Sequence, residues 1–197
     1  MIDFFEDDDW NFQRMDDAPV LSMEFSGKNG RWVCFAQARE EQHQFVFYSI
    51  LPINVPDNQI GAVAEFITRV NYGMIIGNYE LDYGDGEVRY KTSIDVEGDA
   101  LSFSLLKQIV YANVVIMDRY LGGLMRVMYG DAMPAEEVER IEADFEMGDD
   151  ESDENTDYSD DDLKFTVSLD GIDFSKLDDS DNTPKADNDP KIDPSDD

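Results

Sequence analysis

The chain has 197 residues, and 46 Asp and Glu against 15 Lys and Arg give it a formal net charge of −31. Because such a surface repels phosphate backbones, we expect no direct binding to nucleic acid. No apolar run approaches the roughly 20 residues of a membrane span, and the first residues are acidic where a signal peptide would be basic. Cys34 is the single cysteine, so no internal disulfide can form, and we expect a cytoplasmic protein with no part in a membrane.

The composition changes after residue 147. Residues 148–197 carry 19 Asp and Glu against 4 Lys with few apolar side chains, whereas residues 1–147 carry 27 against 11 and nearly all the aromatic residues. A segment so poor in apolar residues cannot offset the entropy that it would lose on ordering. We therefore predict a folded domain over 1–147 and an acidic, disordered tail over 148–197.

The first part of the domain predicts three strands. Residues 2–17 mix aromatic residues with acids, which favours a short helix or an aromatic clip lying on the domain. Apolar residues then alternate over 21–25, the turn 27–30 contains two glycines, and a second strand follows over 31–38, so we expect a hairpin. Aromatic and β-branched residues over 45–53 predict the third strand.

A helix follows these strands. Pro56 and Asp57 mark its start, with the Asp57 side chain as the expected cap. An apolar stripe at helical spacing runs from Ile60 to Val70, and Gly73 is the expected end.

Residues 79–96 predict a second hairpin, because apolar and polar residues alternate on both sides of Gly84-Asp85-Gly86. The expected register places Tyr83 opposite Val88, Asp82 opposite Arg89 and Glu80 opposite Lys91.

The longest predicted element is a helix over 105–129. Its apolar positions cover nearly half the circumference, and the expected solvent-facing residues are Lys107, Gln108, Asp118, Arg119 and Arg126. A last short helix begins at Pro134, with Val138, Ile141 and Phe145 on its apolar side. The order of elements predicts an α+β domain with an antiparallel sheet of about five strands (β-β-β-α-β-β-α) packed with helices.

Two groups of residues on the long helix depart from this simple pattern. Asn113 projects from the apolar side near Tyr120, where an unpaired amide would cost about 1 to 3 kcal/mol. We expect it to bond a strand carbonyl or a tyrosine hydroxyl, the alternative being a ligand site. The second group forms a candidate partner surface, the alternative being scattered surface residues. That group is Tyr111, Val115, Gly122, Arg119 and Arg126.

The tail contains one apolar island, in which Leu163, Phe165, Val167 and Leu169 alternate with other residues. This pattern favours addition as a strand to a sheet edge, either of this chain or of a partner. The alternative is residual hydrophobicity with no binding role.

Residues that could carry chemistry are sparse. His43 is the single histidine and falls in a polar turn, and Cys34 alternates inside a predicted strand, where a buried inert thiol is expected. We find no catalytic constellation, cofactor motif or metal-ligand spacing in the sequence. An enzyme using carboxylates such as Asp82, Asp95 or Asp118 stays the least favoured hypothesis, and it requires those acids to share a cleft with raised pKa values.

Five segments together resemble the YbjN family of bacterial proteins. They are Ala-Gln-Ala-Arg-Glu-Glu at 36–41, Tyr-Ser-Ile-Leu-Pro-Ile-Asn-Val-Pro at 48–56, Glu-Phe-Ile-Thr-Arg-Val-Asn-Tyr-Gly at 65–73, Arg-Tyr-Lys-Thr-Ser-Ile-Asp-Val-Glu at 89–97 and Tyr-Ala-Asn-Val-Val-Ile-Met-Asp-Arg-Tyr at 111–120. The resemblance covers roughly residues 5–145. It implies a sensory-transduction regulator with a fold similar to type III secretion chaperones, without catalysis or cofactor, and often dimeric.

These observations favour a non-enzymatic regulator of signalling or stress response that binds other proteins, with a homodimer as one expected state. A holder of a client protein segment, as in secretion chaperones, is the second hypothesis. For the tail we predict autoinhibition or charge shielding, with solubilisation alone as the alternative.

Overall fold

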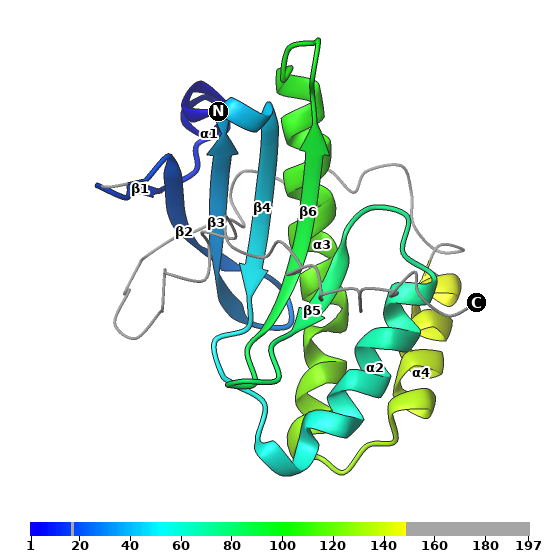
Figure 1. Ribbon diagram of the computed structural model, residues 1–197. Coiled ribbons are helices and arrows are strands. Elements are labelled where there is room, and N and C mark those ends of the chain that lie inside the picture. The colour runs from blue at the N-terminus through cyan, green and yellow to red at the C-terminus, as the bar shows by residue number, and fades with distance from the viewer. Residues whose placement is uncertain (17, 149–197) are drawn as a thin grey trace, which may run out of the picture. The chain divides into compact units, whose positions relative to one another are not determined.

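The computed structural model of the protein describes residues 1–16 and 18–148, and the side chains of 146–148 are not part of that description. One sheet and four α-helices make up this part of the chain (Figure 1). The strands are β1 (Gln13–Arg14), β2 (Val20–Ser26), β3 (Arg31–Arg39), β4 (Gln44–Ile50), β5 (Asn78–Leu81) and β6 (Val88–Asp95). The helices are α1 (Ile2–Asp7), α2 (Ile60–Tyr72), α3 (Phe103–Tyr129) and α4 (Pro134–Gly148).

The sheet is antiparallel and its strands lie in the order β1-β2-β3-β4-β6-β5. This confirms the predicted α+β class and the two hairpins. The sixth strand was not predicted: β1 is only two residues long and pairs with Leu21 and Ser22 of β2. A pair of exposed polar residues has no alternation, so no periodic signal could reveal it.

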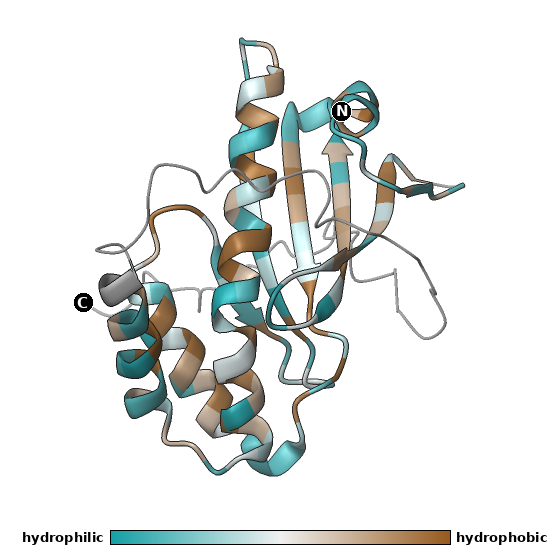
Figure 2. Cartoon of the chain, turned by 180° about the vertical axis from the view of Figure 1, so that it is seen from behind, coloured by the Kyte–Doolittle hydropathy of each residue, from teal (hydrophilic) through white to brown (hydrophobic). Residues whose placement is uncertain are grey.

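The four helices of this part of the chain pack as one layer on one face of the sheet. All four contribute to a hydrophobic cluster with that face, and Phe5 of α1 stacks on Phe47 of β4. The view from behind shows α3 running along this face, with α2 and α4 beside its second half (Figure 2). Ser102 caps α3 by accepting a hydrogen bond from the Leu105 N–H at 3.3 Å.

The start of α2 differs from the prediction. Asp57 lies inside a 3₁₀ turn, Asp57–Gln59, and α2 begins only at Ile60, with Gln59 at the N-cap and no side-chain cap bond. Pro56 supplies the carbonyl that Gln59 N–H bonds at 2.8 Å, so a backbone turn leads into the helix instead of the expected Asp57 cap. Gly73 ends α2 as predicted.

The β5–β6 hairpin also has a different register. Leu81 lies opposite Val88 and Glu80 opposite Arg89, so each predicted partner is displaced by two residues. Asp82 belongs to the turn, where its side chain accepts the Gly84 N–H at 2.6 Å. A displacement of two residues keeps every side chain on its own face of the sheet, so the alternation could not distinguish the two registers.

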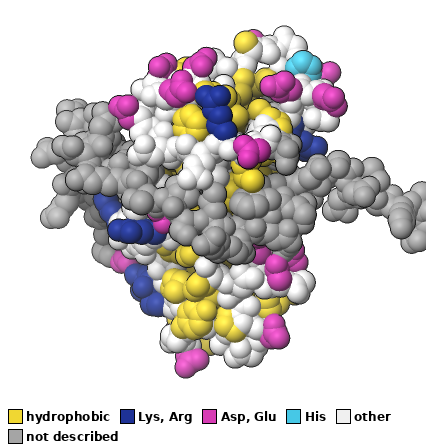
Figure 3. All heavy atoms as spheres, turned by 90° about the vertical axis from the view of Figure 1, so that its left-hand side faces the viewer, with side chains coloured by type: hydrophobic (Ala, Val, Ile, Leu, Met, Phe, Trp, Pro, Cys, Tyr) yellow, Lys and Arg dark blue, Asp and Glu magenta, His cyan; other side chains and the backbone are white. Residues whose placement is uncertain are grey.

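Acidic side chains are spread over the described surface seen from the side of β1 and β2, with apolar side chains between them (Figure 3). None of the helices in residues 1–16 and 18–148 combines the length and hydrophobicity that a bilayer span requires. Apart from Gly148 at the end of α4, the predicted tail over 148–197 lies outside the described residues, and so does its apolar island, Leu163, Phe165, Val167 and Leu169.

Candidate partner-binding groove

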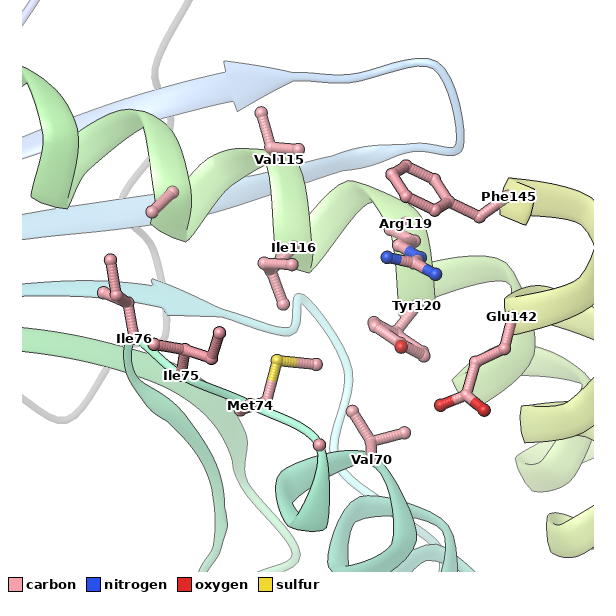
Figure 4. A pocket seen from close by; sticks show the side chains of 12 residues that line it. Val70, Met74, Ile75, Ile76, Val115, Ile116, Arg119, Tyr120, Glu142 and Phe145 are labelled. Carbon is pink, nitrogen blue, oxygen red and sulfur yellow. The ribbon is translucent and has the colours of Figure 1, made fainter. Parts of the chain in front are cut away.

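An apolar groove of about 490 Å³ opens between α3, the end of α4 and the connection from α2 to β5 (Figure 4). Met74, Ile75 and Ile76 form one wall, and Phe145 lies at the far end on α4. Ile75 is 97% exposed and Phe145 is 51% exposed, so large apolar surfaces reach solvent at both ends. Contiguous apolar surface of this kind is typical of a binding site.

The groove wall is exposed but fixed at both ends. Asn71 accepts the Tyr79 N–H at 2.7 Å and donates to the Tyr79 carbonyl at 3.0 Å, which joins the end of α2 to β5. The Tyr90 hydroxyl donates to the Ile76 carbonyl at 2.5 Å. These hydrogen bonds hold the connection in a position in which Ile75 is exposed.

Gly77 makes this path possible. It has φ +80, and a Cβ there would lie 2.5 Å from the Lys91 carbonyl oxygen and 2.6 Å from Thr92 Cγ2. Any side chain would push the connection off the sheet.

Arg119 places a cation in the groove. Its Cζ lies 3.9 Å from the ring centre of Phe145 and 5.2 Å from that of Tyr120. Its Nε is buried and, within the described part of the chain, has no hydrogen-bond partner. A carbonyl or carboxylate oxygen entering the groove could approach the Arg119 guanidinium, so the site combines an apolar wall with one cation.

A second, smaller hollow of about 330 Å³ adjoins the groove, and Arg119, Gly122, Arg126 and Arg140 are among its lining residues. Its cations are engaged in packing α4 on α3. Glu137 is buried and accepts hydrogen bonds from Arg126 Nε at 2.7 Å and Arg140 Nη2 at 2.7 Å. Burial alone would raise the pKa of Glu137, but the hydrogen bonds from Arg140 and Arg126 outweigh it and lower that pKa.

Residues 1–124 match the sequence profile of the YbjN family, which is described as "Putative bacterial sensory transduction regulator". The chain belongs to the YbjN family. Among solved structures it is similar to YbjN of E. coli, a putative transcription regulator, with 10% identity over 62% of this chain and 89% of that one and a TM-score of 0.48. It is also similar to a chain of the HopA1-SchA chaperone-effector complex, with 18% identity over 61% and 88% and a TM-score of 0.40. The search of curated proteins found no match.

In this YbjN-family fold the five residues of the predicted partner surface fall into separate environments. Val115 and Arg119 line the groove, and Gly122 and Arg126 line the adjoining hollow with Arg119. Tyr111 lies elsewhere: its hydroxyl donates to Asp8 at 2.9 Å and its ring packs edge-on against Trp10. The N-terminal segment therefore covers the Tyr111 end of α3.

Asn113 is fully buried and bonds the strands. Its Nδ2 donates to the Phe47 carbonyl at 3.0 Å and to the Tyr90 carbonyl at 3.1 Å, in agreement with the expected strand carbonyl partner. Tyr120 is buried beside Phe66 and Tyr79, and burial raises its pKa. Both residues position α3 on the sheet.

Asp118 was predicted on the solvent-facing side of α3, and that prediction was wrong. It is 7% exposed and accepts the N–H groups of Lys28 at 3.0 Å and Asn29 at 2.8 Å. The β2–β3 turn folds over it, and a Cβ on Gly27 would collide with its carboxylate. The helical period cannot reveal a partner that lies about 90 residues away in the sequence.

The three acids of the enzyme hypothesis do not share a cleft. Asp82 lies in the β5–β6 turn, Asp118 under the β2–β3 turn and Asp95 at the end of β6. Hydrogen bonds from the Gln44 side chain and the Glu97 N–H lower the pKa of Asp95, whereas that hypothesis required raised values. Within the described residues no group of three His, Cys, Asp or Glu could hold a metal ion.

The two other reactive side chains lie where the sequence placed them. His43 is exposed at the end of the 3₁₀ turn Glu40–Gln42. Cys34 is completely buried, and burial raises the pKa of its thiol to about 12. A thiol in that state is a poor nucleophile.

The groove itself was missed by sequence reasoning. Ile75 and Ile76 belong to a connection, and Phe145 meets Arg119 only because α4 folds back on α3. The available signal was the unusual pair of adjacent isoleucines between Gly73 and Gly77, where a connection would ordinarily be polar.

Proposed function

We propose that this protein is a non-enzymatic, cytoplasmic regulator that binds other proteins, and that the groove beside Arg119 is its contact site. The proposal rests on one observation. Ile75 is exposed, and hydrogen bonds at the two ends of its connection fix the backbone that presents it. The family's description as a regulator of sensory transduction supports the general role.

The chemistry of the groove defines the partner segment. Apolar side chains of the partner would cover Ile75, Ile76 and Phe145, and a backbone carbonyl or a carboxylate would bind the Arg119 guanidinium. Aromatic or aliphatic anchors in a pocket supply most of the affinity of such contacts.

The test compares the full chain with two single variants as baits in an extract of the source bacterium. Ile75→Asp removes the groove's most exposed apolar side chain. Tyr83→Asp is the matched control, because Tyr83 is also exposed, at 71%, but lies in the β5–β6 turn away from the groove. Partners that the wild-type chain and the control retain, and Ile75→Asp loses, are then purified and titrated by calorimetry.

Burying an isoleucine is worth about 1.5 to 3 kcal/mol, so Ile75→Asp is expected to weaken binding by about tenfold to a hundredfold. Equal binding by all three chains would refute the groove as the contact site. Turnover of a substrate by the purified protein would refute the non-enzymatic role.

The second hypothesis, a holder of a client segment, uses the same groove. Its distinguishing result is binding of the captured partner only when that partner is unfolded. The regulator proposal requires binding to the folded partner.

A further inference from the structure

The hollow beside the groove is lined by two arginines on the same side of α3. Arg119, Gly122 and Arg126 are spaced by three and four residues, so they lie on one side of the helix, one turn apart. A Cβ on Gly122 would meet Arg126 Nη1 at 3.6 Å and nothing nearer. Because position 122 has no side chain, the space of about 330 Å³ that both arginines line stays open.

Packing of α4 on α3 does not use every donor of these arginines. Arg126 binds Glu137 through Nε and Nη2, and its side chain is 47% exposed. Arg119 pairs with no carboxylate of the described residues, and only its Nε is buried without a partner. An oxyanion entering the hollow would therefore meet the Nη atoms of Arg119 and the Nη1 atom of Arg126.

The charges around the hollow favour a ligand with one negative charge. Arg119, Arg126 and Arg140 line it together with one acid, Asp144. Glu137, whose side chain is only 6% exposed, pairs with both Arg126 and Arg140. Three positive charges against two negative ones leave one positive charge, in a chain whose net charge is −31. A carboxylate would balance that charge, whereas a phosphate dianion would exceed it.

The hollow continues the apolar groove, because Arg119 and Phe145 line both. On the groove side the walls include Ile75 and Ile76, and the acid present there is Glu142. Glu142 would repel a carboxylate in the groove itself, whereas the arginines attract one in the hollow. A segment that fills both spaces therefore has apolar side chains followed, at one end, by an acidic side chain.

We propose that the partner segment held in the groove carries an aspartate or glutamate at one end of its apolar residues, and that this carboxylate binds in the hollow, between Arg119 and Arg126. The inference rests on the proposed function of the groove and adds the chemical class of its occupant. The apolar side chains of the segment provide most of the affinity, and the carboxylate fixes the direction in which the segment lies.

Two capped pentapeptides test this with the full chain. One is acetyl-Glu-Leu-Ile-Leu-Glu-amide, in which an acid follows the apolar residues in either direction, and the other has glutamine in place of both glutamates. Nuclear magnetic resonance titrations follow the methyl signals of Ile75 and Ile76 and the Nε–H signals of Arg119 and Arg126. We expect the acidic peptide to shift all four and to bind about fivefold to tenfold more tightly than the neutral one, because hydrogen bonds between charged groups are stronger than neutral ones.

Three variants assign the difference between the peptides. Arg119→Met keeps an apolar stem against Phe145 but removes the charge, and Gly122→Leu fills the hollow with no change of charge. Each is expected to reduce the preference for the acidic peptide to less than about twofold and to leave the affinity for the neutral peptide nearly unchanged. The matched control Arg14→Met removes an exposed cation from β1, outside the groove and the hollow, and is expected to keep the preference.

The outcomes separate this inference from the proposed function. Equal affinity for the two peptides, or a preference that survives either Arg119→Met or Gly122→Leu or is lost in Arg14→Met, would overturn the inference and leave the groove as the contact site. No shift of Ile75 and Ile76 with either peptide would refute the proposed function and the inference together. Methyl shifts of Ile75 that depend on protein concentration alone would place a second copy of the chain in the groove and overturn the inference.

Discussion

Replacing Asn113 by leucine tests how the structure joins α3 to the sheet. The Asn113 amide donates to the carbonyls of Phe47 and Tyr90 and, at 3.2 Å, to the Thr92 hydroxyl, so one side chain connects the helix to both β4 and β6. Leucine has nearly the same volume but no donor. The variant Asn113→Leu therefore removes the bonds without leaving a large cavity.

The expected loss can be worked out atom by atom. Two buried carbonyls without their donor cost about 2 to 3 kcal/mol together, whereas Thr92 still donates to the Ile109 carbonyl at 3.1 Å. Asn113 Oδ1 is buried without a hydrogen-bond partner in the described part of the chain, and its removal returns about 1 kcal/mol. The net prediction is a free energy of unfolding lower by about 1 to 2 kcal/mol.

Urea denaturation followed by tryptophan fluorescence measures this, because Trp10 and Trp32 are both buried. With a slope of about 2 kcal/mol/M for a domain of this size, the midpoint is expected to fall by about 0.5 to 1 M at constant slope. Asn113→Asp is expected to be worse at pH 7, where the carboxylate would face two carbonyls, and to recover partly on acidification. A leucine variant as stable as the wild type would refute the bridging role.

Two further predictions concern packing and burial. Gly123→Ala places a Cβ 2.5 Å from Ile141 Cδ1 and should lower the free energy of unfolding by about 1 to 3 kcal/mol. In the matched control Gly122→Ala, the new Cβ meets no atom nearer than 3.6 Å. That change should be neutral or stabilising by up to about 1 kcal/mol. Equal effects in urea denaturation would contradict the close α3–α4 contact. Because the Cys34 thiol has its pKa raised from 9.0 to about 12 by burial, its contribution to stability is fully present below pH 9 and is lost as the pH rises from 9 to 12. Cys34→Ala should flatten that part of the stability profile, and an unchanged profile would show that the thiol does not contribute.

The elements of this fold could be predicted because their signals are local. The period of α3 places Leu106, Val110 and Leu124 in the core, and all three are buried. The glycines at 27 and 30 likewise indicate the β2–β3 turn. In each case a residue's immediate neighbours in the sequence determine its environment.

The predictions that were wrong share one physical cause, because the residues concerned interact with partners that lie far away in the sequence or whose register the sequence pattern does not determine. Asp118 is buried because the turn at Lys28 and Asn29 satisfies its carboxylate, and a helical projection contains no information about that turn. The pairing of Glu80 with Arg89 could not be distinguished from one displaced by two residues, because both satisfy the alternation. Long-range geometry decides both cases.

Every part of the candidate groove depends on contacts between residues that are distant in the sequence. Val115 could be selected as an interruption of the polar side of α3 and Arg119 as part of that side, but their meeting with Ile75 and Phe145 requires three elements to be placed together. Tyr111 was selected for the partner surface, but Asp8 and Trp10 cover it.

In the α2–β5 connection, the residues that hold the backbone in place differ from the residue that would contact a partner. Asn71 and Tyr90 hold the backbone of the connection, while the side chain of Ile75 makes almost no contact with the rest of the described fold. The residue at position 75 can therefore change from one homologue to another with little effect on stability. Partner preference within a lineage could drift, or be redesigned, at this single position on an unaltered scaffold.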